Sequence, residues 1–170
     1  MPEKEREKTA PVGKRLKDVV EGVLEELKQK GAIQAWQRPL ENHTPNFIVN
    51  GDTGIVCRNW DPSKMTSLNK HLTEKKITSR FRHRSWSKKI LIIPKLKLDY
   101  ERDKEECERL LAGIEIIDSF PWTTPSNMEE VREKLLPKIR KSVEMRQLKT
   151  TKLGSHSSEF LYLVLPPILP

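Results

Sequence analysis

The sequence predicts an α/β protein whose mixed central sheet is flanked by helices on both faces. Apolar residues repeat at spacings of three and four in several segments, short β-branched runs separate these segments, and one helical segment joins two of the runs. A chain of 170 residues is long enough for one domain. We expect this domain over residues 12–147, after a flexible segment over 1–11 and before a C-terminal linker and apolar tail over 148–170.

The first predicted elements are a helix and three strands. Apolar residues mark one face of a helix from Val12 to Lys30, and Gly31 is expected to end it. Three strands are predicted next, over residues 32–40, 46–50 and 54–60. The last two would form a hairpin in which Gly51 and Gly54 provide the backbone freedom that a tight turn needs.

The following elements alternate between helix and strand. The predicted ranges are a helix from Pro62 to about 77, a strand over 90–96, a helix over 99–113, a strand over 114–120 and a helix over 127–147. Because one helix joins the last two strands, these strands are expected to be parallel. Ser126 and Glu129 are expected to cap the last helix, and Pro137 is expected to bend or interrupt it.

The charge of the chain points to a polyanionic partner. The formal net charge is +8 and the pI is about 9.5. Residues 53–98 hold twelve Lys and Arg against two acids, and the densest stretch, "KKITSRFRHRSWSKK", mixes cations with Phe81, His83 and Trp86. Cations suit phosphates and aromatic rings can stack on bases, whereas the alternative is a solvated basic loop with Trp86 packed on the core. The residues predicted to bind nucleic acid are Arg58, Lys75, Lys76, Arg80, Arg82, Arg84, Trp86, Lys88 and Lys89.

The hairpin "PNFIVNGDTGIVCRNW", residues 45–60, carries a spaced motif. Asn46 follows a proline at the start of one strand, and Val56 and Arg58 stand two positions apart at the end of the next. This pattern resembles the Pro-Asp pair and the acid-x-Lys triplet of the PD-(D/E)xK nuclease superfamily. The ending Asn59-Trp60 resembles its archaeal Holliday-junction-resolvase and Mrr-like branches. The predicted order over residues 12–120 is similar to the αβββαβ core of the restriction-endonuclease-like fold.

The resemblance implies a nuclease site in which the metal-binding carboxylates and the lysine have been replaced. Carboxylates in this family hold Mg²⁺ ions that activate water, and the lysine assists at the cleaved phosphate. Here Lys17, Asn46 and Val56 stand in acidic positions, and Arg58 replaces the lysine. The hydrocarbon side chain of Val56 has no ligand atom, and the planar guanidinium of Arg58 suits phosphate binding. Glu21, one helical turn after Lys17, is the nearest remaining acid.

We therefore expect a catalytically inactive protein that binds nucleic acid, DNA rather than RNA, without a metal ion or other cofactor. It would pair with itself or with a catalytically active partner protein. One alternative is an active Mg²⁺-dependent DNA endonuclease with a rearranged site at Glu21. The other is a protein-interaction or assembly module that uses the apolar tail "EFLYLVLPPILP".

The remaining features predict a cytoplasmic protein. Cys57 and Cys107 lack the spacing of a zinc site or a disulfide framework, so both are expected to be buried thiols. The four histidines show no metal-motif spacing either. The charged N-terminus does not resemble a secretory signal, and the longest apolar run is about half of a membrane span. No membrane insertion is expected.

Overall fold

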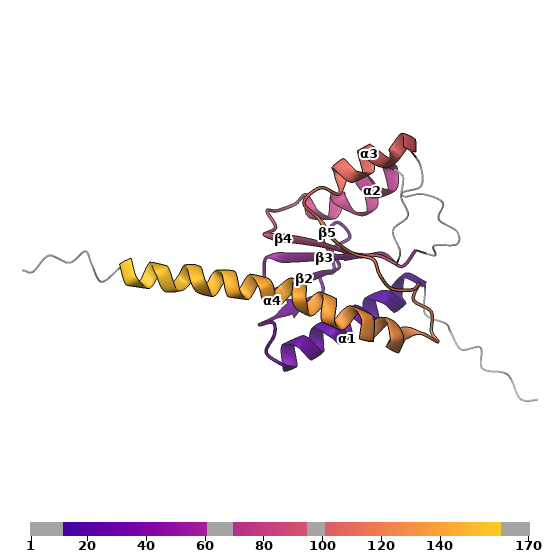
Figure 1. The fold of residues 1–170 in the computed structure, drawn as a ribbon. Coiled ribbons are helices and arrows are strands. Elements are labelled where there is room, and N and C mark those ends of the chain that lie inside the picture. Colours follow the sequence, from indigo (N-terminus) through magenta and orange to yellow (C-terminus); the bar gives the residue numbers. More distant parts are fainter. Residues whose placement is uncertain (1–11, 61–69, 95–100, 161–170) are drawn as a thin grey trace, which may run out of the picture.

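The computed structural model describes residues 12–60, 70–94 and 101–160 (Figure 1). Predictions for residues 1–11, for the start of the second helix and for the tail beyond residue 160 lie outside these ranges. The elements are α1 (Val12–Gln29), β1 (Trp36–Gln37), β2 (Phe47–Val49), β3 (Thr53–Cys57), α2 (Lys70–Lys76), the 3-10 helix η1 (Thr78–Phe81), β4 (Lys88–Ile92), α3 (Glu101–Leu110), β5 (Glu115–Ile117) and α4 (Met128–Phe160).

The five strands form one mixed sheet in the order β1-β2-β3-β4-β5. The pairs β1–β2 and β2–β3 are antiparallel, whereas β3–β4 and β4–β5 are parallel. The α/β class, the mixed sheet and the parallel pairing of β4 with β5 are thus confirmed. The strand predicted over 32–40 is reduced to β1, because the amide groups of Gln34 and Ala35 both donate to the side-chain oxygen of Asn50 instead of to a strand.

Helices cover both faces of the sheet, and each face has its own apolar core (Figure 1). Helices α1 and α4 pack on one face, where Leu24 and Leu135 meet Ile55 of β3. On the other face, Ile77, Phe81 of η1 and Leu111 pack with Val56. Successive residues of β3 therefore enter opposite cores, as the alternation of a strand requires.

The β2–β3 turn uses only one of the two glycines predicted for it. Asn50 and Gly51 have φ angles of 50° and 78°, and the amide of Asp52 donates to the carbonyl of Val49 at 3.3 Å. Two successive positive φ angles suit the right-handed twist of a hairpin. Gly54 instead lies inside β3, paired with Ile48, so its predicted role in the turn is wrong.

Gly54 is required by packing. A Cβ atom there would lie 3.0 Å from Pro45, 3.1 Å from Phe81 and 3.2 Å from Trp86, which is closer than ordinary contact. We expect Gly54→Ala to lower the free energy of unfolding by about 1–3 kcal/mol through overpacking. Urea denaturation measures the change. Gly22→Ala is the matched control, because no atom lies within 4 Å on this exposed position of α1, and it should stabilise by about 0.5–1 kcal/mol. Equal stability of both variants would contradict the prediction.

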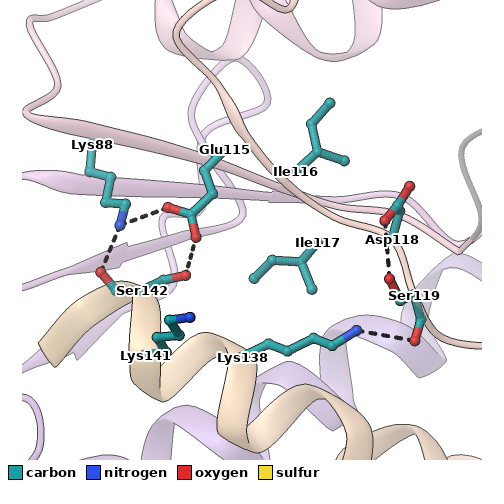
Figure 2. A pocket seen from close by; sticks show the side chains of 9 residues that line it. All are labelled: Lys88, Glu115, Ile116, Ile117, Asp118, Ser119, Lys138, Lys141 and Ser142. Carbon is teal, nitrogen blue, oxygen red and sulfur yellow. Dashed lines mark hydrogen bonds and ion pairs between the residues drawn. The ribbon is translucent and has the colours of Figure 1, made fainter. Parts of the chain in front are cut away.

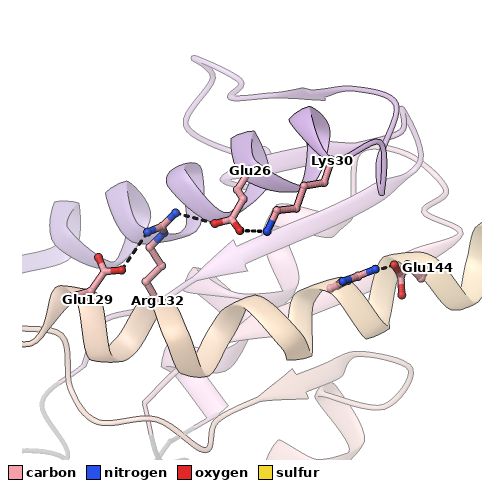
Figure 3. A network of polar contacts seen from close by, with 6 residues as sticks. Glu26, Lys30, Glu129, Arg132 and Glu144 are labelled. Carbon is pink, nitrogen blue, oxygen red and sulfur yellow. Dashed lines mark hydrogen bonds and ion pairs between the residues drawn. The ribbon is translucent and has the colours of Figure 1, made fainter.

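An ion pair joins α1 to α4 and belongs to a small network of charged side chains (Figure 3). Arg132 binds Glu26 of α1 at 2.6 Å and Glu129 of its own helix at 3.0 Å. A hydrogen bond from Lys30 is the main cause that lowers the pKa of Glu26, with a further contribution from Arg132. A lowered carboxyl pKa stabilises the fold at neutral pH, and this contribution is lost as the pH falls through the lowered value.

Helix α4 is longer than predicted. It runs without interruption past Pro137 and through the segment 148–154 that was expected to be a linker, and it extends beyond the sheet in Figure 1. The predicted capping box is wrong, since the helix begins at Met128 and the carbonyl of Asn127 accepts from the amide of Val131 at 3.0 Å. None of the helices in the described ranges is long and apolar enough to cross a membrane.

Candidate nucleic-acid interface

Three of the predicted site positions lie together at the end of the β2–β3 hairpin. The pairing of Phe47 with Ile55 continues to place Asn46 opposite Val56, and opposite residues of antiparallel strands point to the same face. Arg58 follows two residues later, and its amide donates to the carbonyl of Ile92 at 2.9 Å, which continues the pairing of β3 with β4. The fold therefore brings the three positions of the motif together at one end of the hairpin.

The side chains of Asn46 and Val56 serve the fold. Asn46 is buried, and its side-chain oxygen accepts a hydrogen bond from the amide of Cys57 at 2.8 Å. Val56 is fully buried in the apolar core on the α2–α3 face. One group is thus occupied as a structural acceptor and the other is a hydrocarbon, so neither is suited to hold a metal ion.

Asn59, the next residue of the motif, is a structural link. Its side chain donates to the carbonyl of Thr123 at 2.9 Å and accepts from the amide of the same residue at 3.0 Å. These two buried bonds join the segment after β3 to the segment before α4. In this chain, Asn59 of the motif therefore makes a tertiary contact with Thr123.

Arg58 is partly buried and its guanidinium is directed toward backbone carbonyls. It donates to the carbonyl of Cys57 at 3.1 Å and to that of Lys76 at the end of α2. The Nε atom is buried without a hydrogen-bond partner in the described residues. Burial, followed by the charge of Arg80, lowers the pKa of Arg58 to about 10, so the group remains cationic at neutral pH.

Lys17, Arg58 and Arg80 form what we call the cation cluster. Burial lowers the pKa of Lys17, and the charges of Arg58 and then Arg80 lower it further. Burial also lowers the pKa of Arg80, whose guanidinium donates to the carbonyl of Thr44 at 3.0 Å. The three charges repel one another at the place where the resemblance expects carboxylates. A bound anion would relieve this repulsion.

Glu21 is engaged by a different cation. Its carboxylate accepts from Arg38 at 2.8 Å in a half-exposed ion pair between α1 and the segment after β1. Arg38 also lies 6.0 Å from the ring centroid of Phe47. The acid that sequence analysis left as the surviving ligand thus has its charge balanced by Arg38.

Four of the predicted cations are exposed on the α2–η1 side of the sheet. Lys75 and Lys76 end α2, and Arg82 and Arg84 follow η1. Arg82 pairs with Glu74 at 3.2 Å, while Arg84 donates to the carbonyl of Gly51. Surface ion pairs of this kind exchange readily for phosphate because they contribute little stability.

Trp86 packs within the protein. Its ring contacts the core on the α2–α3 face, lies edge-on to Phe81 at 6.5 Å between centroids, and carries the guanidinium of Arg84 at 4.0 Å. Phe81 itself is only 5% exposed. The alternative that Trp86 is a core residue therefore describes the structure better than a stacking surface formed by Trp86 and Phe81.

Lys88 and Lys89 point to opposite faces of β4, and only one of them can join the interface. Lys88 faces α4, where it binds Glu115 at 2.7 Å and donates to the carbonyl of Ser142 at 2.7 Å beside a groove of about 480 Å³ (Figure 2). Burial raises the pKa of Glu115, but hydrogen bonds from Lys88 and Ser142 outweigh it and the net shift is downward. Lys89 is half-buried on the α2–α3 side. Lys88 is therefore a structural cation.

The two cysteines are buried thiols that form no disulfide bond, as predicted. Burial raises the pKa of Cys57 to about 12, although Arg58 and Lys17 act in the opposite direction. The thiol of Cys57 is therefore protonated at neutral pH and is not a nucleophile. In the described ranges, no three His, Cys, Asp or Glu side chains converge in a way that could hold a metal ion.

Lys17 was missed as a candidate binding residue. It lies outside the basic run of residues 53–98, so local charge density gave no reason to select it. The alignment with the family motif placed Lys17 at an acidic position, and this was the one signal available for it. Comparison with protein-family models, curated proteins and solved structures gave no match.

Proposed function

We propose that the protein binds the backbone of nucleic acid through the cation cluster, without a metal ion and without cutting it. The observation that carries this proposal is the gathering of Lys17, Arg58 and Arg80 with lowered pKa values. Burial and mutual repulsion make these cations less stable than they would be in water, so a phosphate gains more from them than from ordinary surface cations.

The order of elements supports a restriction-endonuclease-like core. Helix α1, strands β1 to β3, helix α2 and strand β4 follow one another as in the αβββαβ arrangement that the motif resembles. In such a core, the end of β3 is where metal ions would meet the cleaved phosphate. The cation cluster occupies this place, and its side chains offer positive charge but no metal ligands.

The surrounding surface extends the proposed interface. Lys75, Lys76 and Arg82 are exposed near the end of α2, whose Lys76 carbonyl Arg58 contacts, while the exposed Arg84 binds the β2–β3 turn at the other end of the hairpin. Several phosphates could thus be contacted at once. Each such contact makes the affinity more dependent on salt.

The test is binding of the full chain to duplex DNA in EDTA, with RNA as a second probe, over a series of salt concentrations. We expect EDTA to leave the affinity unchanged, and the logarithm of the binding constant to fall by about 0.9 per phosphate contact for each tenfold rise in salt. The same DNA incubated with Mg²⁺ or Mn²⁺ should remain intact. Absence of binding to both nucleic acids would refute the proposal, and metal-dependent cutting would favour the nuclease alternative.

A further inference from the structure

Two histidines that are far apart in the sequence lie side by side in the fold. The ring centroids of His43, in the loop before β2, and His83, in the turn after η1, are 6.2 Å apart, and the ring planes are inclined at 56°. Both side chains are exposed. Their nitrogens can therefore be reached by a solute.

The backbone that carries this pair is braced. Arg80 donates to the carbonyl of Thr44 at 3.0 Å, which joins the residue after His43 to the segment that leads to His83. Arg84, directly after His83, donates to the carbonyl of Gly51 in the β2–β3 turn. The first bond joins the two loops and the second fixes the His83 segment to the hairpin, and neither uses an imidazole. Binding of a ligand between the rings would therefore restrict the protein backbone little further.

We propose that His43 and His83 bind one divalent transition-metal ion between their rings. Imidazole nitrogen is a preferred ligand of Zn²⁺, Ni²⁺ and Cu²⁺. An ion about 2.0–2.1 Å from one nitrogen of each ring would hold the ring centroids roughly 4.5 to 5.2 Å apart at octahedral or tetrahedral angles. The observed distance is 6.2 Å, so rotation of the two exposed side chains must bring the rings roughly 1 Å closer.

This site provides two protein ligands. The described residues contain no group of three or more His, Cys, Asp and Glu that could hold a metal ion, so water would fill the remaining positions. Mg²⁺ prefers oxygen ligands and should not bind here. The site does not depend on the proposed nucleic-acid binding, although the Arg80–Thr44 bond places it next to the cation cluster.

Calorimetric titration of the full chain with NiCl₂ tests the proposal. We expect one site that is lost or weakened by about 10–100-fold or more in both His43→Gln and His83→Gln, because removing a ligand should cost at least as much as removing its outer-shell partner. His71→Gln/His156→Gln is the matched control, since it removes the other two histidines, and it should keep the site. MgCl₂ should give no heat at this site.

A second measurement is independent of any variant. In the NMR spectrum of the native chain, ZnCl₂ should shift the imidazole Cε1–H signals of His43 and His83 together and leave those of His71 and His156 in place. Full Ni²⁺ affinity in either single variant, absence of binding by the native chain, or loss of the site only in the control would overturn the proposal.

Discussion

Replacement of Lys17 and Arg80 by glutamine is expected to weaken binding to duplex DNA by roughly sixty-fold at 0.1 M salt. Each phosphate contact contributes about 0.9 to the slope of log K against log salt, so each is worth roughly eightfold at 0.1 M if the contribution vanishes near 1 M. The slope of the double variant should be shallower by about 1.8. Fluorescence anisotropy at several salt concentrations measures both quantities.

The matched control is Lys28→Gln/Arg109→Gln, which removes the same two residue types and also lowers the formal net charge of +8 by two. Both residues are exposed, and Lys28 lies about 16 Å further along α1 than Lys17. The control should bind almost as well as the native chain. If the two double variants lose the same affinity, net charge and not the cation cluster determines binding, and the proposed interface is wrong.

The cation cluster also predicts an effect on stability. The lowered pKa of Lys17 means that its charge opposes folding at neutral pH, since a cation with a lowered pKa is more favourable in the unfolded chain. Lys17→Gln should therefore melt slightly higher than the native chain in the absence of nucleic acid. If Lys17→Gln shows both a lower affinity for DNA and a higher Tm, then Lys17 contributes to binding at the expense of stability.

Replacement of Asn59 by alanine is expected to lower the free energy of unfolding by about 2–4 kcal/mol. The variant removes two buried hydrogen bonds and leaves the amide and the carbonyl of Thr123 unsatisfied, and each such group costs about 1–3 kcal/mol. Asn59 joins the end of β3 to the segment before α4, so no local contact replaces it. Urea denaturation measures the loss.

Asn42→Ala is the control for Asn59, because Asn42 is exposed in the loop between β1 and β2. It should change the free energy of unfolding by no more than about 0.5 kcal/mol. At a temperature where Asn59→Ala is still folded, its affinity for DNA should stay close to that of the native chain. A stable Asn59→Ala variant that fails to bind would instead place Asn59 in the interface.

Local sequence patterns were sufficient for most of the fold. The period of apolar residues predicted α1, the signals at Asp99 and Gly113 predicted α3, the β-branched runs predicted the β2–β3 hairpin, and the helix between β4 and β5 predicted their parallel pairing. The errors arose where a distant contact overrides the local pattern. Asn50 takes the hydrogen bonds of residues 34 and 35 away from β1, and ring packing, not turn geometry, explains Gly54.

The candidate site could be predicted in part. The spacing of Asn46, Val56 and Arg58 is local to one hairpin, so the sequence was enough to place them on one face. Lys88 and Lys89 are adjacent and looked equivalent, but strand alternation sends one toward α4 and the other toward the α2–α3 side. Charge density along the chain does not distinguish the two faces of the strand.

By itself, the sequence determined that position 56 offers no metal ligand, because Val56 is a hydrocarbon whatever the fold around it. Only the tertiary structure decided which groups surround that position. Lys17 comes from α1, Arg58 from the residue after β3 and Arg80 from η1, while His43 and His83 come from two different loops. Sequence periodicity reports the neighbours of a residue within its own helix or strand. Contacts between distant elements depend on how the apolar faces of those elements pack.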